Sequence, residues 1–97
     1  MPKFSIVIPL YNKEKDIKNT LDSVFKQTIS DYEIIIVNDG STDGSEKIVS
    51  SIKDPRIKLF SKKNEGVSKT RNFGVDKAIA KHIVFLDADD YWYTNHL

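Results

Sequence analysis

The sequence predicts an α/β fold, in which three helices pack on a four-stranded, mostly parallel sheet. Strand-like runs alternate with helix-like segments along the chain, and only a few residues connect them. This alternation is typical of parallel strands joined by right-handed crossovers. The first two strand-like runs are almost continuously apolar, as expected for strands covered on both faces. At 97 residues, the chain forms at most one domain.

The first half of the chain predicts a strand, a helix and a second strand. Residues 4–9 are almost all apolar and end at Pro9, which has no amide hydrogen to donate to a neighbouring strand. Asn12 is a candidate cap for an amphipathic helix over residues 13–27, whose apolar stripe is Ile17, Leu21, Val24 and Phe25. Residues 32–40 then repeat the strand pattern and run into polar residues and glycine.

The second half continues the alternation. Asp43 and Glu46 have the spacing of a capping box, which predicts a second helix that ends before Pro55. Residues 56–60 alternate charged and apolar side chains, so we expect an edge strand with one buried face. A third helix is predicted over residues 67–81.

One side of this third helix is expected to pack on the sheet through Arg71, Val75, Ala78 and Ile79. Gly74 lowers helix propensity by about 1 kcal/mol relative to alanine. Its presence inside the helix therefore predicts a close approach to the sheet. The fourth strand, residues 82–86, is expected to be buried because its residues are mainly apolar or β-branched.

Three carboxylates follow the fourth strand directly, at Asp87, Asp89 and Asp90. Unpaired acids cannot share a dry core, so we expect them at the open end of the strand. Two Asp residues separated by one position suit a hard cation that needs oxygen ligands and can bridge to a diphosphate. The alternative is that they are solvated loop residues.

Composition narrows the class of protein. Lys and Arg number 15 against 14 Asp and Glu, so there is no overall basic field of the kind that marks a nucleic-acid binder. Cysteine is absent, which excludes disulfides and thiolate metal sites. The apolar runs are far shorter than a membrane span, and the start of the chain does not resemble a signal peptide. These features predict a soluble, cytoplasmic protein.

Polar residues follow three of the four predicted strands, at 9–12, 38–40 and 87–90. Ligands of parallel sheets bind outside the carboxyl ends of the strands, so these segments are expected to meet at one site. Tyr11 could stack on a flat base or could serve in packing. Asp39 could accept hydrogen bonds from a base or ribose, or could form an Asx turn with Gly40.

Other charged residues carry weaker signals. Lys62 and Lys63 are expected to be solvated, whereas Arg71 is a candidate anion contact near a helix N-terminus. His82 and His96 lack the spacing of a zinc site. Neither a G-x-G-x-x-G nor a Walker A motif follows the first strand, and no serine lies in a G-x-S-x-G turn.

Four segments in order, residues 5–12, 33–44, 64–74 and 85–90, resemble the motifs of the amino-terminal, nucleotide-binding half of a family 2 glycosyltransferase of the GT-A fold. The resemblance covers essentially the whole chain. It implies a Rossmann-like sheet with strand order 3-2-1-4, and an enzyme that transfers a sugar from a nucleoside diphosphate sugar, expected to be a UDP-sugar, to an acceptor hydroxyl with inversion.

The resemblance also implies roles for individual residues. Pro9 and Tyr11 would line the base pocket, with Tyr11 stacked on uracil, and Asp39 would hydrogen-bond the base. Arg71 would contact the nucleotide or a phosphate. The resemblance also implies a metal site.

In that site, Asp87 would contact the ribose or the water shell of the metal, and Asp89 would ligate Mn²⁺ or Mg²⁺ held by the diphosphate. Such a cation neutralises the charge that develops on the departing nucleoside diphosphate.

The family's catalytic base, a carboxylate, is expected beyond Leu97. The chain is therefore expected to bind the donor but not to transfer sugar by itself. In the full enzyme, the acceptor would be a glycan or a lipid-linked molecule, and membrane association is possible.

The resemblance further leaves residues 82–86 as an apolar edge strand beside Tyr91, Trp92 and Tyr93, which predicts self-association. Two alternative functions are a nucleotide-binding module without activity and a phosphatase of the haloacid-dehalogenase type. The latter also carries an Asp-x-Asp motif after an apolar strand.

Overall fold

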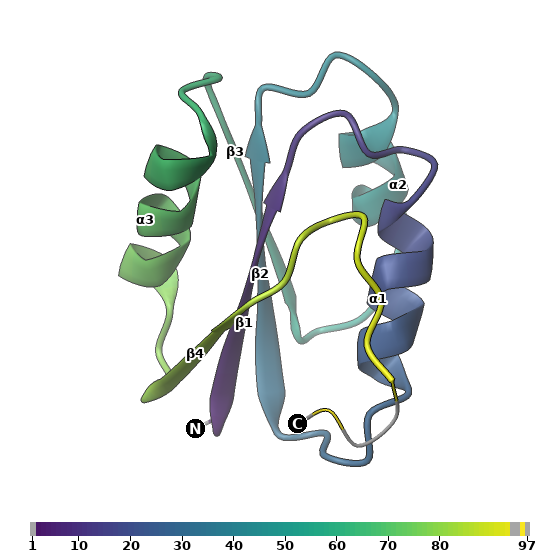
Figure 1. Cartoon of the computed structure of the whole chain (residues 1–97), viewed down its shortest axis with the longest axis vertical. Coiled ribbons are helices and arrows are strands. Elements are labelled where there is room, and N and C mark those ends of the chain that lie inside the picture. Colours follow the sequence, from purple (N-terminus) through teal and green to yellow (C-terminus); the bar gives the residue numbers. More distant parts are fainter. Residues whose placement is uncertain (1, 94–95, 97) are drawn as a thin grey trace.

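A computed structural model describes residues 2–93 and residue 96. It contains the predicted alternation of strands and helices (Figure 1). In chain order, the elements are β1 (Phe4–Leu10), α1 (Ile17–Phe25), β2 (Tyr32–Asp39), α2 (Ser45–Ser50), β3 (Ile57–Lys62), α3 (Val67–Lys77) and β4 (His82–Phe85). Among the residues described, no helix is long and apolar enough to cross a membrane.

The strands form one sheet in the order β3-β2-β1-β4, and every neighbouring pair is parallel. This confirms the predicted order and the parallel arrangement. The strand arrows point toward one end of the molecule in Figure 1. The loops that follow the strands are therefore brought to the same edge of the sheet.

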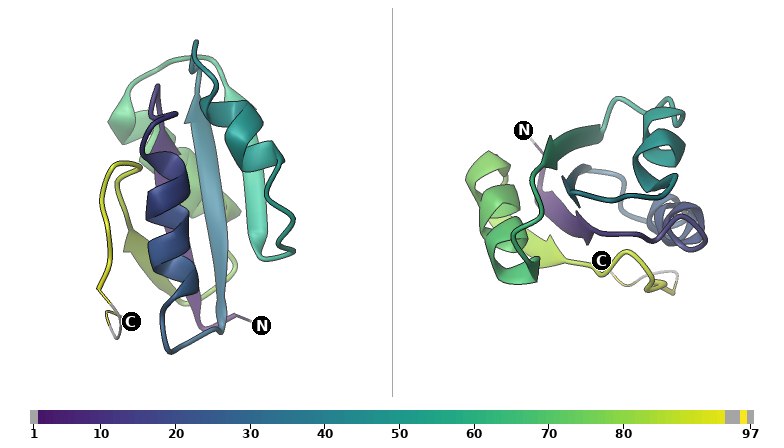
Figure 2. Two further views of the ribbon diagram at one scale, coloured as in Figure 1. Left: turned by 90° about the vertical axis from the view of Figure 1, so that its right-hand side faces the viewer. Right: turned by 90° about the horizontal axis from the view of Figure 1, so that it is seen from above.

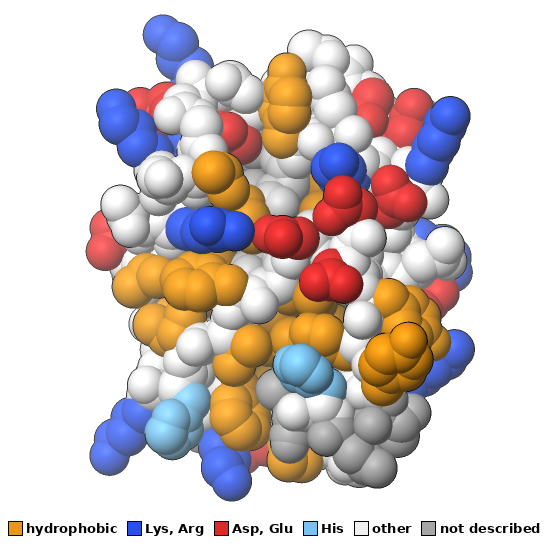
Figure 3. All heavy atoms as spheres, in the orientation of Figure 1, with side chains coloured by type: hydrophobic (Ala, Val, Ile, Leu, Met, Phe, Trp, Pro, Cys, Tyr) orange, Lys and Arg blue, Asp and Glu red, His pale blue; other side chains and the backbone are white. Residues whose placement is uncertain are grey.

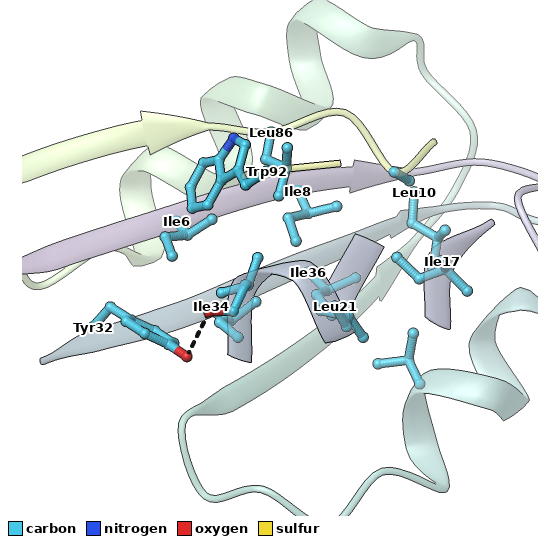
Figure 4. Close-up of a cluster of buried hydrophobic side chains, with 13 residues drawn as sticks. Ile6, Ile8, Leu10, Ile17, Leu21, Tyr32, Ile34, Ile36, Leu86 and Trp92 are labelled. Carbon is cyan, nitrogen blue, oxygen red and sulfur yellow. Dashed lines mark hydrogen bonds between the residues drawn. The ribbon is translucent and has the colours of Figure 1, made fainter. Parts of the chain in front are cut away.

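Helices cover both faces of the sheet: α1 and α2 lie on one face and α3 lies on the other (Figures 1 and 2). All eight residues of β2 are consequently buried, as its apolar sequence predicts. On the α1 side, Ile8 and Ile36 belong to the same buried cluster as Leu21 (Figure 4). A smaller cluster on the α3 side contains Val7, Ile35 and Val37.

Gly74 lets α3 approach the sheet closely, as predicted. A Cβ atom at this position would overlap Cγ1 of Val7 and lie 3.5 Å from Cγ2 of Val37. The expected packing side was only partly right: Ala78 packs against the cluster of Val7, Ile35 and Val37, but the buried residues of α3 are Thr70 and Gly74, and Ile79 is 47% exposed. The helix also ends earlier than predicted, because Ala78 has an extended backbone with φ −70° and ψ 138°.

Two predicted helix caps are not formed. Asn12 has a positive φ of 50° and lies before a turn, so α1 begins only at Ile17. Its side-chain oxygen instead accepts a hydrogen bond from the Thr42 amide at 2.8 Å. The Asp43–Glu46 capping box is also absent, because Glu46 accepts a hydrogen bond from the side-chain amide of Asn38 at 2.6 Å. Both side chains therefore join neighbouring elements.

The two outer strands differ in their agreement with the sequence. β3 lies at one edge, as its alternating pattern predicts. β4 lies at the other edge and is not the buried strand first expected: Ile83 is 37% exposed and Phe85 is 47% exposed. Among the described strands, its one neighbour is β1. This agrees with the edge position implied by the family resemblance.

Candidate functional site

A cleft of about 560 Å³ lies at the carboxyl ends of the strands. Five of the six predicted site residues line it: Pro9, Tyr11, Asp39, Asp87 and Asp89. Other residues of the lining, which the sequence did not indicate as site residues, include Lys13, Asn64, Gly66 and Thr70. The cleft is thus built from the loops after β1, β3 and β4, the end of β2 and the start of α3.

The β1 side of the cleft carries an aromatic ring. Pro9 pairs with Val37 near the end of β1, so its missing amide hydrogen lies at the strand end as predicted. Tyr11 follows the strand, is 47% exposed and belongs to neither cluster of buried side chains described for this chain. Its ring is therefore accessible to a flat ligand from the cleft.

Asp39 organises the loop between β3 and α3. Its side chain is 6% exposed, and its carboxylate accepts hydrogen bonds from Lys62 Nζ at 3.0 Å, the Glu65 amide at 2.8 Å and the Gly66 amide at 3.1 Å. Burial alone would raise the pKa of the Asp39 carboxyl, but these hydrogen bonds together hold that pKa below its ordinary value. The carboxylate is therefore ionised and held in place.

Two predictions about this region need correction. The Lys62 side chain is only 10% exposed, because it is paired with Asp39 and, at 3.1 Å, with Glu65; it is not a solvated lysine. The turn at Gly40 is held by Asn38, whose side-chain oxygen accepts a hydrogen bond from the Ser41 amide at 3.1 Å. The carboxylate of Asp39 is engaged by the β3–α3 loop instead.

Asp87 and Asp89 each lie beside a basic residue. Arg71 Nη2 is 3.2 Å from Asp87 Oδ1, and Lys13 Nζ is 3.1 Å from Asp89 Oδ2. The two carboxylate side chains are 59% and 48% exposed, respectively, so a ligand can reach both. Figure 3 shows acidic and basic side chains together on this face, above an area rich in apolar side chains.

Arg71 lies beside Asp87 and is not among the residues that line the cleft. Its guanidinium carbon is 5.8 Å from the ring centre of Phe85. Its Nε is buried and has no hydrogen-bond partner among the residues described. Arg71 is therefore positioned to set the charge around Asp87.

The acids fit a cation that is shared with a phosphate ligand. Within residues 2–93 and 96, no three His, Cys, Asp or Glu side chains are grouped to hold a metal by themselves. Mg²⁺ and similar hard cations commonly use one or two carboxylates together with substrate phosphates and water. Asp87 and Asp89 supply such a pair at the edge of the cleft.

The loops after β1 and β2 are fastened to each other. The Lys13 amide donates a hydrogen bond to Ser45 Oγ at 2.8 Å, and the Gly44 amide donates to Glu14 Oε2 at 2.9 Å. The Asn12 amide likewise donates to Ser41 Oγ at 3.0 Å. These contacts fix the chain on both sides of the Lys13 side chain. The sequence did not indicate these contacts between the two loops.

The chain is similar to known glycosyltransferases in sequence. It is 46% identical over 96 residues to an uncharacterised glycosyltransferase of Rickettsia bellii, covering 98% of this chain and 14% of the relative. It is 43% identical over 93 residues to the uncharacterised glycosyltransferase EpsJ of Bacillus subtilis, covering 94% of this chain and 27% of the relative. The chain therefore spans about a quarter or less of these relatives.

Solved structures agree. The crystal structure of S. aureus TarS 1-349 in complex with UDP-GlcNAc matches with a TM-score of 0.87 and 35% identity, over 92% of this chain and 27% of that chain. The mannosyltransferase PcManGT from Pyrobaculum calidifontis, in complex with GDP-Man and Mn²⁺, matches with a TM-score of 0.87 and 26% identity, over 94% and 28%. These likenesses confirm the predicted GT-A architecture.

A family model described as glycosyl transferase family 2 matches residues 5–97. This span contains all four sequence motifs and every residue of the cleft. The match also decides against the haloacid-dehalogenase alternative, because it assigns residues 5–97, including the Asp-x-Asp motif at 87–89, to a different family. The chain belongs to glycosyl transferase family 2.

Proposed function

We propose that this chain is the donor-binding portion of an inverting glycosyltransferase that uses a nucleoside diphosphate sugar. The observation that carries the proposal is that Tyr11, Asp39 and Asp89, which follow three different strands, line one cleft. An aromatic ring can stack on a nucleobase, and a fixed buried carboxylate can accept a hydrogen bond from the edge of that base. An accessible carboxylate can bind a cation that also contacts the diphosphate.

The proposed roles follow from the surroundings of each side chain. The exposed Tyr11 ring stacks on the base next to Pro9, and Asp39 accepts a hydrogen bond from the base. A carboxylate has about four acceptor positions, so Asp39 can hold its loop and a ligand together. Asp87 contacts the ribose or the water shell of the cation, with Arg71 beside it.

Asp89 is the proposed direct ligand of Mn²⁺ or Mg²⁺. When bound, the cation would offset negative charge on the departing diphosphate. Lys13, now 3.1 Å from Asp89, would be released toward the phosphates as the cation takes its place. The Mn²⁺ in the PcManGT complex supports a divalent cation for this chain.

The donor is proposed to be UDP-linked. TarS, the more similar in sequence of the two solved structures described above, is in complex with UDP-GlcNAc, whereas PcManGT is in complex with GDP-Man. Stacking on Tyr11 is possible for either base, so the hydrogen bond to Asp39 would carry the preference. The acceptor, a glycan or a lipid-linked molecule, and the carboxylate base are proposed to be bound or supplied by other parts of the whole protein.

Calorimetric titration of the chain with UDP, with and without Mn²⁺, tests the proposal. We expect Mn²⁺ to increase UDP affinity by about tenfold or more, since the cation joins Asp89 to the diphosphate. Asp89→Ala should abolish this difference. Asp76→Ala, which removes an exposed acid of α3, should retain it. UDP binding that is absent, or that is equal with and without Mn²⁺, would contradict the proposal.

A nucleotide-binding module without catalysis is the competing function. The cleft contains proposed contacts for the nucleobase, the ribose and the diphosphate. No residue of the cleft is proposed as the catalytic base that deprotonates an acceptor hydroxyl. We therefore expect the 97-residue chain to bind UDP-sugar without transferring the sugar. Transfer by this chain to any acceptor, detected as released UDP together with a glycosylated product, would overturn that expectation.

A further inference from the structure

Helix α1 and the residues directly after it carry a row of buried polar side chains that faces the segment after β4. Thr20, Ser23 and Gln27 are 1%, 0% and 7% exposed. Each bonds to the backbone of that segment: Ser23 Oγ accepts from the Trp92 amide at 3.1 Å, and Gln27 Nε2 donates to the Tyr93 carbonyl at 2.7 Å. Figure 2 shows this segment running alongside α1.

Thr20 occupies a special place in this row because its partners lie on both sides of Asp89. Its Oγ1 is 2.9 Å from the Ala88 carbonyl oxygen and 2.6 Å from the Asp90 carbonyl oxygen. The hydroxyl has one proton, so the two carbonyls share it. The Asp90 amide also donates to the Asp87 carbonyl at 3.0 Å. Thr20 therefore holds the turn that presents Asp87 and Asp89.

We propose that Thr20 is a positioning residue for the Asp89 carboxylate. This inference rests on the proposed function, because it concerns the residue that would bind the cation. The side chain of Asp89 is 48% exposed, and its described contact is an ion pair with the 40% exposed Lys13. Exposed ion pairs hold side chains weakly. The position of the carboxylate must therefore come from the backbone beneath it.

The backbone on both sides of Asp89 is anchored in the core. Ala88 is 3% exposed, and Trp92 is 6% exposed and lies next to Leu86 and Ile6 (Figure 4). Between these two buried residues, the Thr20 hydroxyl bonds to the backbone carbonyls of Ala88 and Asp90. If it is removed, the buried Ala88 carbonyl and the partly buried Asp90 carbonyl lose this donor, and water or a changed turn must satisfy them.

Thr20→Val tests this role, because valine keeps the branched shape and removes the hydroxyl. Thr20→Ser should restore the hydroxyl. Tyr32→Phe is the matched control, since it removes a buried hydroxyl that donates to the Val24 carbonyl at 3.2 Å, far from the cleft. If Thr20→Val does not fold, Thr20→Ala removes the hydroxyl without adding bulk and takes its place.

The first readout is the Mn²⁺ concentration needed for half-maximal UDP binding. Residues that orient metal ligands commonly change metal affinity by about 10- to 100-fold when replaced. We expect Thr20→Val to raise this concentration by about tenfold, and Thr20→Ser and Tyr32→Phe to remain within about twofold of the original chain. A value for Thr20→Val equal to that of Tyr32→Phe would overturn the inference.

The second readout is hydrogen exchange of the Asp90 amide, which needs no ligand. We expect this amide to exchange faster in Thr20→Val than in Tyr32→Phe under conditions of equal global stability, and to be protected again in Thr20→Ser. Equal exchange in all variants would overturn the inference. If the original chain shows no Mn²⁺-dependent UDP binding, the proposed function fails, and this readout still decides whether Thr20 holds the turn.

Discussion

At the scale of single residues, the exposed ring of Tyr11 is the group that the proposed function uses most directly. Stacking of a base on an aromatic side chain contributes about 1–3 kcal/mol. Tyr11→Ala should therefore weaken UDP binding by about tenfold or more, both with and without Mn²⁺, while Tyr11→Phe should retain binding. Tyr93→Ala is the control, because Tyr93 is 83% exposed and outside the cleft lining. Equal titrations for Tyr11→Ala and Tyr93→Ala would exclude stacking.

Asp39 links the cleft to stability through its lowered pKa. As the pH falls, the Asp39 carboxyl of the unfolded chain, with a pKa of about 4, takes up a proton at a higher pH than the same carboxyl in the folded chain. The contribution of Asp39 to the free energy of unfolding is therefore fully present above the pKa of the unfolded chain. It is lost as the pH falls through the lower pKa of the folded chain. Asp39→Asn should be less stable at pH 7 and should lose less stability between pH 5 and pH 3, as measured by urea unfolding.

The pKa of the buried Glu33 carboxyl is also lowered, so Asp39→Asn should still lose some stability as the pH falls. Asp76→Asn, at an exposed position, is the control and should keep the pH dependence of the original chain. An unchanged pH dependence in Asp39→Asn would mean that the carboxylate is not held by the β3–α3 loop.

Five of the twelve residues that line the cleft were predicted, because they lie at or just after the carboxyl ends of strands. Tyr11, Asp39 and Asp89 were indicated in this way, and the parallel sheet brings these strand ends together. Thr20 was not indicated, because its partners lie 68 and 70 positions further along the chain. Within the sequence it is one polar residue in an amphipathic helix, and nothing local shows that its hydroxyl is buried.

At the scale of elements, Gly74 determines how closely α3 lies on the sheet. Gly74→Ala would place a methyl group against Val7, which is fully buried. Overpacking costs about 1–3 kcal/mol, which exceeds the gain of about 1 kcal/mol in helix propensity. We therefore expect urea unfolding to show a net loss of up to about 2 kcal/mol. Asn72→Ala, at an exposed position of α3, should be neutral or slightly stabilising.

The existence and order of the elements were predictable, but their ends were not. Apolar periodicity indicated α1 most clearly, since a buried stripe is a property of the whole segment. The start of α1 was missed because Asn12, a good capping residue by type, bonds to the β2–α2 loop. The role of Glu46 was missed because its carboxylate bonds to Asn38 of β2 and not to the start of its own helix. Side chains used between elements cannot be assigned from local spacing.

At the scale of the whole molecule, β4 leaves an apolar edge open. Ile83 and Phe85 are partly exposed on a strand with one described neighbour. Open edges favour pairing with another chain, so the apparent mass from light scattering should rise with concentration. Ile83→Lys should reduce this rise, whereas Ile79→Lys, which replaces an exposed apolar residue outside the strands, should not. A monomer at every concentration would contradict the proposed self-association.

The central claim is that loops from separate strands form one nucleotide site. Amide chemical shifts of the ¹⁵N-labelled chain, titrated with UDP and Mg²⁺, test it most directly. We expect the largest changes together at residues 10–13, 39–40, 64–67 and 87–90. Changes confined to one of these segments, or centred on the smaller cleft of about 340 Å³ near Pro2, Tyr32 and Arg56, would contradict the claim.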